Sequence, residues 1–171
     1  MRTILNILGP LTNPAGAPNQ VMGVFHADLV GIQARVLKML GSRHVLTVHG
    51  QDGLDEITIT GPTHVAELKH DFISEYAIEP KQFGLDVAPL EALQVKDAAE
   101  SKARVESVLA NEAGPSRDVV ILNAAAALYV SGVAASLWDG VALARDALAR
   151  GAARAKLEHL VKFTRGFAKA G

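Results

Sequence analysis

The first half of the chain alternates short apolar runs with polar loops. NQVMGVF (19–25) predicts a strand, ADLVGIQARVLKML (27–40) a helix, and RHVLTVHG (43–50) a second strand. Apolar residues recur at helical spacing in the middle segment, and Gly41 follows it as a predicted helix C-cap. A strand, a helix and a strand in this order predict a βαβ unit whose strands are parallel and joined by a right-handed crossover.

Three further apolar runs follow, and all are short. DEITIT (55–60), HVAELKH (64–70) and FISEYAI (72–78) are rich in β-forming residues, and Gly61-Pro62 separates the first from the second. Such runs predict a small antiparallel excursion from the sheet.

The second half changes to a helical, alanine-rich pattern in which glycine or proline separates the segments. The run Ala124–Ala127 favours close packing between helices, because a methyl group adds little to the distance between helix axes. The predicted helical segments cover residues 96–111, 116–132, 137–151 and 152–166.

Composition is that of an ordinary globular protein. The 171 residues contain 49% hydrophobic and 20% charged residues, with no repeat and no clear linker, so we expect a single α/β domain over residues 1–171. A chain of this size buries roughly two-thirds of its unfolded surface.

Charge and residue usage exclude several classes of site. Seventeen basic residues against eighteen acidic ones leave a net charge of −1, which gives no electrostatic footprint for nucleic acid. Cysteine is absent, which excludes disulfides, thiolate metal sites and cysteine nucleophiles. No stretch approaches the roughly 20 apolar residues of a membrane span, and the N-terminal residues lack a signal-peptide pattern, so we expect a cytoplasmic protein.

An acidic segment follows the second predicted strand. HGQDGLDEIT (49–58) places the carboxylates of Asp52, Asp55 and Glu56 beside two glycines. Open α/β sheets bind ligands at the carboxyl ends of parallel strands. Neighbours in a regular strand point to opposite faces, so Asp55 and Glu56 can share a ligand only if the backbone turns, as Gly53 permits.

Two interpretations of this segment remain open from the residues alone. Carboxylate oxygens without a histidine or thiol cluster favour Mg²⁺, which takes one or two carboxylates and leaves its other positions to water and phosphate. Alternatively, the segment is a polar turn with solvated acids, since Asp-Gly is a common turn dipeptide.

The N-terminal segment RTILNILGPLTNPAGAPN (2–19) predicts a short helix followed by a proline-rich loop. Gly9-Pro10 and Asn13-Pro14 end the helix, because the residue before a proline avoids the α region. The pattern alone indicates a structural connection and no chemistry.

Three segments together resemble the anthranilate phosphoribosyltransferase family. They are RTILNILGPLTNPA (2–15), VHGQDGLDEITITGPT (48–63) and ILNAAAALYVSG (121–132), in the order and approximate spacing of that family. The resemblance implies an α/β fold containing the C-terminal part of a mixed, largely parallel sheet flanked by helices, as in phosphoribosyltransferases and nucleoside phosphorylases.

The resemblance also implies a reaction in tryptophan biosynthesis. Family members transfer the phosphoribosyl group of phosphoribosyl pyrophosphate to anthranilate, giving N-(5'-phosphoribosyl)anthranilate and pyrophosphate. In the family, the Asp-Glu of the GLDE segment binds the Mg²⁺ that accompanies phosphoribosyl pyrophosphate, which assigns that role here to Asp55 and Glu56. By the same comparison, Pro10 borders the anthranilate channel.

The resemblance covers only part of the family's pattern. Family members carry an earlier helical domain, which makes most contacts of their homodimer, and a glycine-rich GTGGD loop that holds pyrophosphate; neither pattern occurs in this sequence. We therefore expect this chain to correspond to the C-terminal half, with no catalytic residue identifiable in it and no measurable transferase activity alone. Arg2 does not inherit the anthranilate-binding arginine, which lies a few residues earlier in the family.

Several alternatives stay open at this point. The chain could be an inactive transferase fragment, a subunit completed by a separately encoded N-terminal half, or a non-catalytic relative that binds nucleic acid. The near-neutral charge argues against nucleic-acid binding, and the retained Asp55-Glu56 pair argues against decay of the metal site. A nucleoside phosphorylase fragment is a further alternative, but the GPLTNP and GLDE segments fit the anthranilate enzymes better.

The remaining distinctive residues are predicted to be structural. We expect His49 to be a hydrogen-bonding residue at a strand end, Asn123 an internal hydrogen-bonding residue and Trp138 a packing residue. The cations of residues 149–171 are expected on a solvated helix face. The other histidines are too scattered in the sequence to suggest a metal set: His26, His44, His64, His70 and His159.

Overall fold

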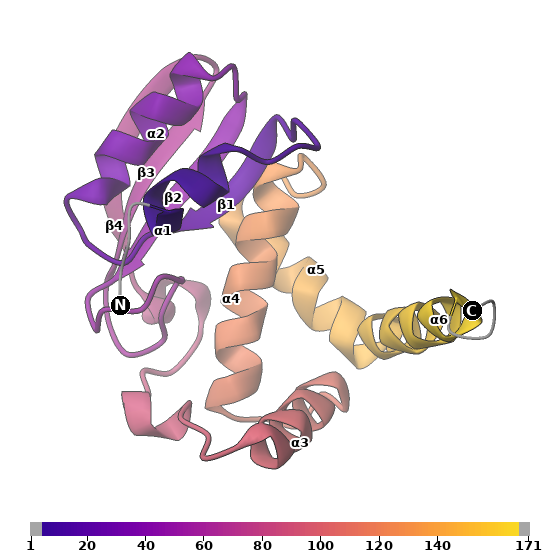
Figure 1. The fold of residues 1–171 in the computed structure, drawn as a ribbon. Helices are drawn as coiled ribbons and strands as arrows, with labels where there is room; N and C mark the ends of the chain where they lie inside the picture. Colours follow the sequence, from indigo (N-terminus) through magenta and orange to yellow (C-terminus); the bar gives the residue numbers. More distant parts are fainter. Residues whose placement is uncertain (1–4, 168–171) are drawn as a thin grey trace.

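The computed structural model describes residues 5–167 and is drawn in Figure 1. Arg2 and Ile4 of the N-terminal segment lie outside the described residues. The helices are α1 (Leu5–Leu8), α2 (Leu29–Met39), α3 (Ala98–Leu109), α4 (Pro115–Val130), α5 (Leu137–Ala149) and α6 (Ala152–Phe167); the strands are β1 (Asn19–Gly23), β2 (His44–Gly50), β3 (Thr63–Lys69) and β4 (Phe72–Ile78); and short 3-10 helices are η1 (Gly9–Leu11), η2 (Pro80–Phe83) and η3 (Leu90–Ala92).

The four strands form one mixed sheet in the order β1-β2-β3-β4. β1 pairs with β2 in parallel across α2, which confirms the predicted βαβ unit. The other two pairings are antiparallel, and the α/β class with a mixed sheet is confirmed. A two-residue turn, His70-Asp71, joins β3 to β4, and both residues have positive φ (50° and 64°), as a tight turn matching the strand twist requires.

Both faces of the central strand β2 are buried, which explains its nearly continuous apolar run. Val45 belongs to a core cluster with α2, whereas Leu46 and Val48 belong to a second, larger cluster with α4 and α5. Helix α2 therefore covers one face of the sheet and α4 the other, in agreement with their contacts to the strands.

The predicted close packing along the alanine run is confirmed. A Cβ added to Gly140 of α5 would lie 2.6 Å from the carbonyl oxygen and 2.9 Å from the Cα of Ala125 in α4. Ala125 and Ala126 are almost fully buried. Small side chains on both helices thus let the two backbones approach directly.

The predicted strand over residues 55–60 is wrong. This segment joins no strand of the sheet: the Ile57 amide donates to Asn123 Oδ1 and the Thr58 amide to Thr63 Oγ1. The Ile59 carbonyl accepts from the Ala88 amide, which lies outside the sheet. Ile57 and Ile59 are nonetheless buried in the larger core cluster. The β-branched pattern therefore reports the burial of two isoleucines in a loop, not a ladder of strand hydrogen bonds.

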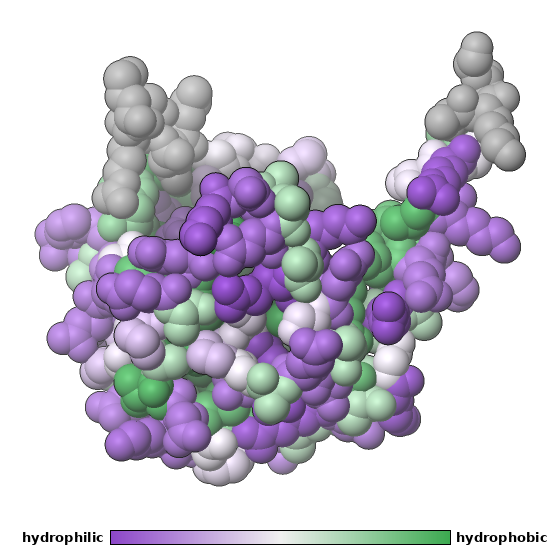
Figure 2. All heavy atoms as spheres, turned by 90° about the horizontal axis from the view of Figure 1, so that it is seen from below, coloured by the Kyte–Doolittle hydropathy of each residue, from purple (hydrophilic) through white to green (hydrophobic). Residues whose placement is uncertain are grey.

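Helix α6 extends away from the rest of the protein (Figure 1). Its exposed apolar side chains include Leu160, Phe163 and Phe167, and the space-filling view shows apolar atoms along the arm at the right of the molecule (Figure 2). The cations of this helix were predicted to be solvated, and Arg154, Lys156, Lys162 and Arg165 are exposed. Among residues 5–167, no helix combines the length and the apolar character needed to cross a membrane.

A polar network connects α4 to the face of the sheet that it covers. Glu67 Oε1 accepts hydrogen bonds from His44 Nε2 (3.0 Å) and the Tyr129 hydroxyl (2.7 Å), and Oε2 accepts one from the Tyr76 hydroxyl (2.9 Å). Lys69 Nζ donates to the Tyr129 hydroxyl at 3.0 Å. Burial alone would raise the pKa of Glu67, but the three hydrogen bonds outweigh it and hold that pKa below its ordinary value.

Replacing this carboxylate should destabilise the fold. Glu67→Gln is expected to lower the free energy of unfolding by about 1–3 kcal/mol, because an amide cannot accept from all three donors and leaves a buried polar group unpaired. Chemical denaturation measures the loss. Glu75→Gln is the matched control: its ion pair with Arg35 is exposed, so the change should cost less than about 1 kcal/mol. Equal losses in the two variants would contradict the network's role.

The contribution of Glu67 should also depend on pH in a defined direction. Because its pKa is lowered by folding, the stabilisation is present above the unfolded-state pKa of about 4.3 and is lost as pH falls through the lower pKa of the folded protein. The stability difference between the wild type and Glu67→Gln should therefore shrink in strong acid. Denaturation curves at neutral pH and at a series of acidic pH values test this, and a difference that does not change with pH would refute it.

Candidate metal and substrate site

The two predicted metal ligands lie on the loop between β2 and β3. Asp55 and Glu56 are exposed at the rim of a groove of about 550 Å³, so the structure brings both to one cavity, as a shared ligand requires. Arg104 also lines the groove, but its guanidinium already donates to the Ala92 carbonyl (2.9 Å) and to Ser116 Oγ (3.1 Å). The walls are otherwise largely apolar: Leu54, Leu93, Val95, Val105, Val108, Leu109, Val119 and Val120.

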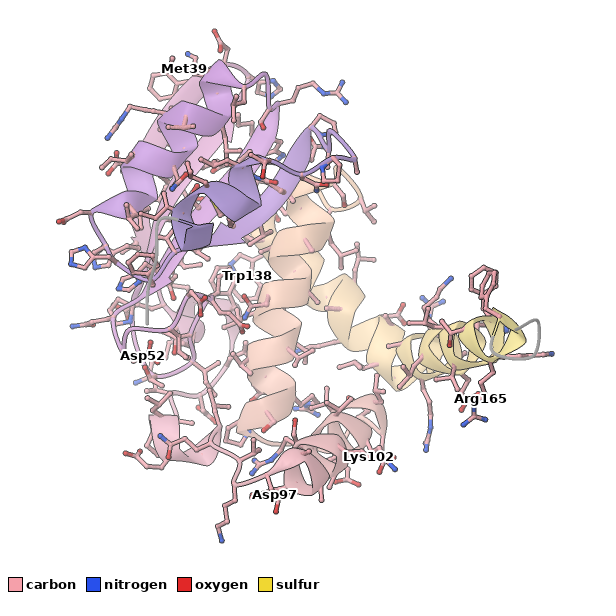
Figure 3. The ribbon with its side chains drawn as sticks, in the orientation of Figure 1. Met39, Asp52, Asp97, Lys102, Trp138 and Arg165 are labelled. Carbon is pink, nitrogen blue, oxygen red and sulfur yellow. The ribbon has the colours of Figure 1, made fainter. Side chains whose placement is uncertain are left out.

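Asp52, the third carboxylate of the segment, closes the loop on itself. Its Oδ2 accepts hydrogen bonds from the hydroxyls of Thr58 (2.6 Å) and Thr60 (2.8 Å), and its Oδ1 accepts one from the Leu54 amide (3.1 Å). Burial alone would raise the pKa of Asp52, but these hydrogen bonds outweigh it and lower that pKa. Figure 3 shows Asp52 on the loop below the sheet. Its carboxylate therefore serves the loop rather than a ligand.

Strand β1 fixes the loop from a second side. A Cβ added to Gly23 would lie only 1.6 Å from the carbonyl oxygen of Asp55, so no larger residue fits between the strand end and the loop. His49 is buried and its Nδ1 lies 2.7 Å from the carbonyl oxygen of Val24, to which it donates. The predicted role of His49 as a hydrogen-bonding residue at a strand end is confirmed.

The local electrostatics fit a hard cation. Burial and the neighbouring charge of Asp55 both raise the pKa of Glu56 above its ordinary value. Two adjacent carboxylates that repel each other offer oxygen ligands of the kind that Mg²⁺ takes, and a bound cation would relieve the repulsion. Among residues 5–167, no cluster of three or more histidine, aspartate or glutamate residues is placed to hold a metal ion. The pair can therefore supply part of a coordination sphere and leaves room for ligands from a substrate.

Pro10 lines a different cavity. The loop from Gly9 to Pro14 and the strand residues from Gln20 to Gly23 enclose a pocket of about 510 Å³. Gly23 forms part of this pocket and also approaches the Asp55 backbone, so the wall of this pocket is in contact with the carboxylate loop. Pro10 therefore does not line the groove of Asp55 and Glu56. Arg2 lies outside the described residues.

The sequence did not predict the contact of Gly23 with the loop or the binding of Ile57 by Asn123. Asn123 was predicted only as an internal hydrogen-bonding residue, which is confirmed; its amide binds the backbone of Ile57, directly after the carboxylate pair. Gly23 gave one readable signal, since an isolated glycine in a strand marks a close backbone approach.

Trp138, predicted to be a packing residue, lies 5.8 Å from Phe83 between ring centres while remaining 57% exposed.

Comparison with known proteins gives one consistent result. The family model described as "Glycosyl transferase family, a/b domain" matches residues 1–154. Over 164 residues, the chain is 59% identical to the anthranilate phosphoribosyltransferase of Laribacter hongkongensis and 58% identical to that of Chromobacterium violaceum. Each match covers 96% of this chain and 48% of the relative. The chain thus spans about half the length of the curated relatives it matches.

Solved structures agree. The anthranilate phosphoribosyltransferase of Thermus thermophilus superposes with a TM-score of 0.86 at 43% identity, covering 96% of this chain and 49% of that one. The enzyme from Saccharomyces cerevisiae in complex with PRPP and Mg gives a TM-score of 0.82 at 27% identity, covering 95% of this chain and 47% of that one. Neither the sequence relatives nor the structures favour a nucleic-acid-binding protein or a nucleoside phosphorylase.

A methyl group at Gly23 should disturb the carboxylate loop. Gly23→Ala is expected to lower the free energy of unfolding by about 1–3 kcal/mol, the usual cost of overpacking, because the new Cβ overlaps the Asp55 carbonyl. Gly9→Ala is the control, since a Cβ there meets no atom within 4 Å and Gly9 lines the same pocket. Urea denaturation of both variants decides: a Gly23→Ala protein as stable as Gly9→Ala would show that the close approach is not required.

Proposed function

The chain belongs to the glycosyl transferase family, and from this premise we propose that it forms part of an anthranilate phosphoribosyltransferase. The proposed reaction transfers the phosphoribosyl group of phosphoribosyl pyrophosphate to anthranilate and releases pyrophosphate. The observation that carries the proposal is the carboxylate pair Asp55-Glu56 on a tightly held loop, in a chain 59% identical over 164 residues to an enzyme of that name.

The proposed ligands follow from the solved relatives. The yeast enzyme is described in complex with PRPP and Mg, and another structure of it with 4-fluoroanthranilate. We propose that Asp55 and Glu56 hold Mg²⁺ in this chain, because they are the exposed, unengaged carboxylates of the loop while Asp52 is bound by Thr58 and Thr60. Pro10 remains a proposed anthranilate contact, in the pocket that adjoins the loop at Gly23.

In the proposed reaction the protein mainly positions the two substrates. The anthranilate nitrogen forms a bond to the anomeric carbon, the bond from that carbon to pyrophosphate breaks with its electron pair leaving on pyrophosphate, and the nitrogen releases a proton. When bound, Mg²⁺ supplies positive charge where negative charge develops on the leaving group. Asp55 and Glu56 contribute by placing their oxygens at the rim of one groove. Asp52 and Gly23 contribute by fixing the backbone of the loop that carries the pair.

This assignment gives the chain one share of a larger site. The matched region covers about half of each relative, so we propose that the groups holding the phosphates of the substrate come from the other half. A carboxylate pair without a phosphate-binding partner should bind Mg²⁺ weakly, because the substrate normally completes the coordination. The 171-residue chain alone is therefore expected to form no product from anthranilate and phosphoribosyl pyrophosphate.

A chimera tests the proposed function. The part of the Laribacter hongkongensis enzyme that precedes the match is joined to residues 1–171 of this chain and assayed with anthranilate, phosphoribosyl pyrophosphate and Mg²⁺. The chimera is expected to consume anthranilate, measured by its fluorescence. Asp55→Asn and Glu56→Gln should each lower kcat/KM by about 10- to 100-fold or more. Mutating a residue that only hydrogen-bonds a metal ligand already lowers metal affinity or activity by about this factor.

The control replaces a carboxylate that lines neither of the two cavities. Asp146→Asn on α5 removes an exposed group paired with Arg150 and should leave kcat/KM unchanged. A folded chimera without activity would overturn the proposed reaction. Full activity in the Asp55 and Glu56 variants would overturn the proposed metal ligands.

A further inference from the structure

The carboxylate pair needs support from outside its own loop. Asp55 and Glu56 belong to neither a helix nor a strand, and both are exposed. Two adjacent carboxylates repel each other, and an unsupported loop would let them separate into solvent. The Asp52 carboxylate accepts hydrogen bonds from Leu54, Thr58 and Thr60 of this loop. None of these bonds involves Ile57, the residue directly after the pair.

That residue, Ile57, is bound by one side chain from α4. The amide of Ile57 donates to Asn123 Oδ1 at 3.0 Å, and Asn123 Nδ2 donates to the Ile57 carbonyl at 2.8 Å. The two residues are 66 positions apart in the chain. Both polar backbone groups of Ile57 are therefore satisfied by a single side chain, while its apolar side chain is buried in the core.

The orientation of the Asn123 amide is itself fixed. Nδ2 also donates to the Val119 carbonyl, one turn earlier in α4, at 3.0 Å. An asparagine presents one acceptor and two donors in a single plane, and here all three bonds are used. Aspartate would lose both donors, and leucine, of similar size, would lose the donors and the acceptor.

We infer that Asn123 is a positioning residue for the metal-binding pair: by clamping Ile57 to α4, it holds Asp55 and Glu56 together at the rim of one groove. This inference rests on the proposed function for the identity of the ligand. The clamp itself is defined by contacts that do not involve a metal. Gly23 of β1 approaches the backbone of Asp55, so a second contact from outside the loop acts on the first residue of the pair.

The test compares three versions of the full chain: the wild type, Asn123→Leu and Tyr129→Phe. Asn123→Leu removes all three hydrogen bonds. Tyr129→Phe, on the same helix, removes the bonds to Glu67 and Lys69 but leaves Asn123 intact. It therefore controls for a general loosening of α4, and the wild type is the reference.

Two NMR measurements are made on each protein. Amide hydrogen exchange at Ile57 and ¹⁵N relaxation over residues 54–58 report the order of the loop without any metal. Broadening of the same amides by Mn²⁺, with competition by Mg²⁺, reports divalent-cation binding at the pair and detects weak sites.

The clamp predicts a specific contrast. In Asn123→Leu, exchange at Ile57 should speed up by roughly tenfold or more, the residues around the pair should become mobile, and the concentration of Mg²⁺ needed for half-competition should rise by about 10- to 100-fold. Tyr129→Phe should behave like the wild type in both measurements, even if its melting temperature falls.

Three other results would count against the positioning role of Asn123. Unchanged exchange and mobility in Asn123→Leu would overturn the inference, as would equal loosening in Tyr129→Phe, because the effect would then belong to α4 as a whole. A wild type whose loop is ordered but shows no response to Mn²⁺ or Mg²⁺ would count against the proposed metal ligands, and with them against a metal-positioning role. The same exchange data would still show whether the clamp exists.

Discussion

The packing of α4 against the sheet is the interaction on which the rest of the structure depends. One helix holds three parts of the molecule at successive positions along its length. Asn123 binds the carboxylate loop, Ala125 receives the backbone of α5 at Gly140, and Tyr129 binds Glu67 on the sheet. Because a helix is stiff over such a length, the loop, α5 and the sheet are fixed relative to one another by a single element.

The carboxylate loop shows why this rigidity matters. Adjacent residues in a strand point to opposite faces, so two neighbouring carboxylates can serve one ligand only outside regular structure. A loop lacks the ladder of hydrogen bonds that orders a strand. Partial burial, and then the charge of Asp55, also raise the pKa of Glu56 and make its ionisation harder. Side-chain bonds from Asp52 and Asn123 and the close approach of Gly23 at the end of β1 replace the missing ladder and order the backbone.

Much of the fold could be predicted from the sequence, and the exceptions have a physical cause. The βαβ unit, the hairpin of β3 and β4 and the later helices follow from local periodicity, which those elements obey. Residues 55–60 failed because Ile57 and Ile59 are buried by tertiary packing, which imitates a strand pattern. The pair Asp55-Glu56 was located from its chemistry and its resemblance to a family, but the bonds of Asn123 span 66 positions, and no local pattern encodes such a contact.

Two of the segments that carry the family resemblance meet at this loop, and the third lies across a pocket from the strand that contacts it. The proline-rich loop of residues 9–14 faces β1 across a pocket that ends at Gly23, Gly23 touches the backbone of Asp55, and Asn123 binds the residue after Glu56. Asn123 and the carboxylate loop, 66 positions apart, are therefore neighbours in space, and the contacts of Asn123 and Gly23 constrain the backbone that carries the same two carboxylates. Stretches that look unrelated in the sequence therefore combine in the folded protein: Asp52 holds the loop from within, and Asn123 and Gly23 hold it from outside.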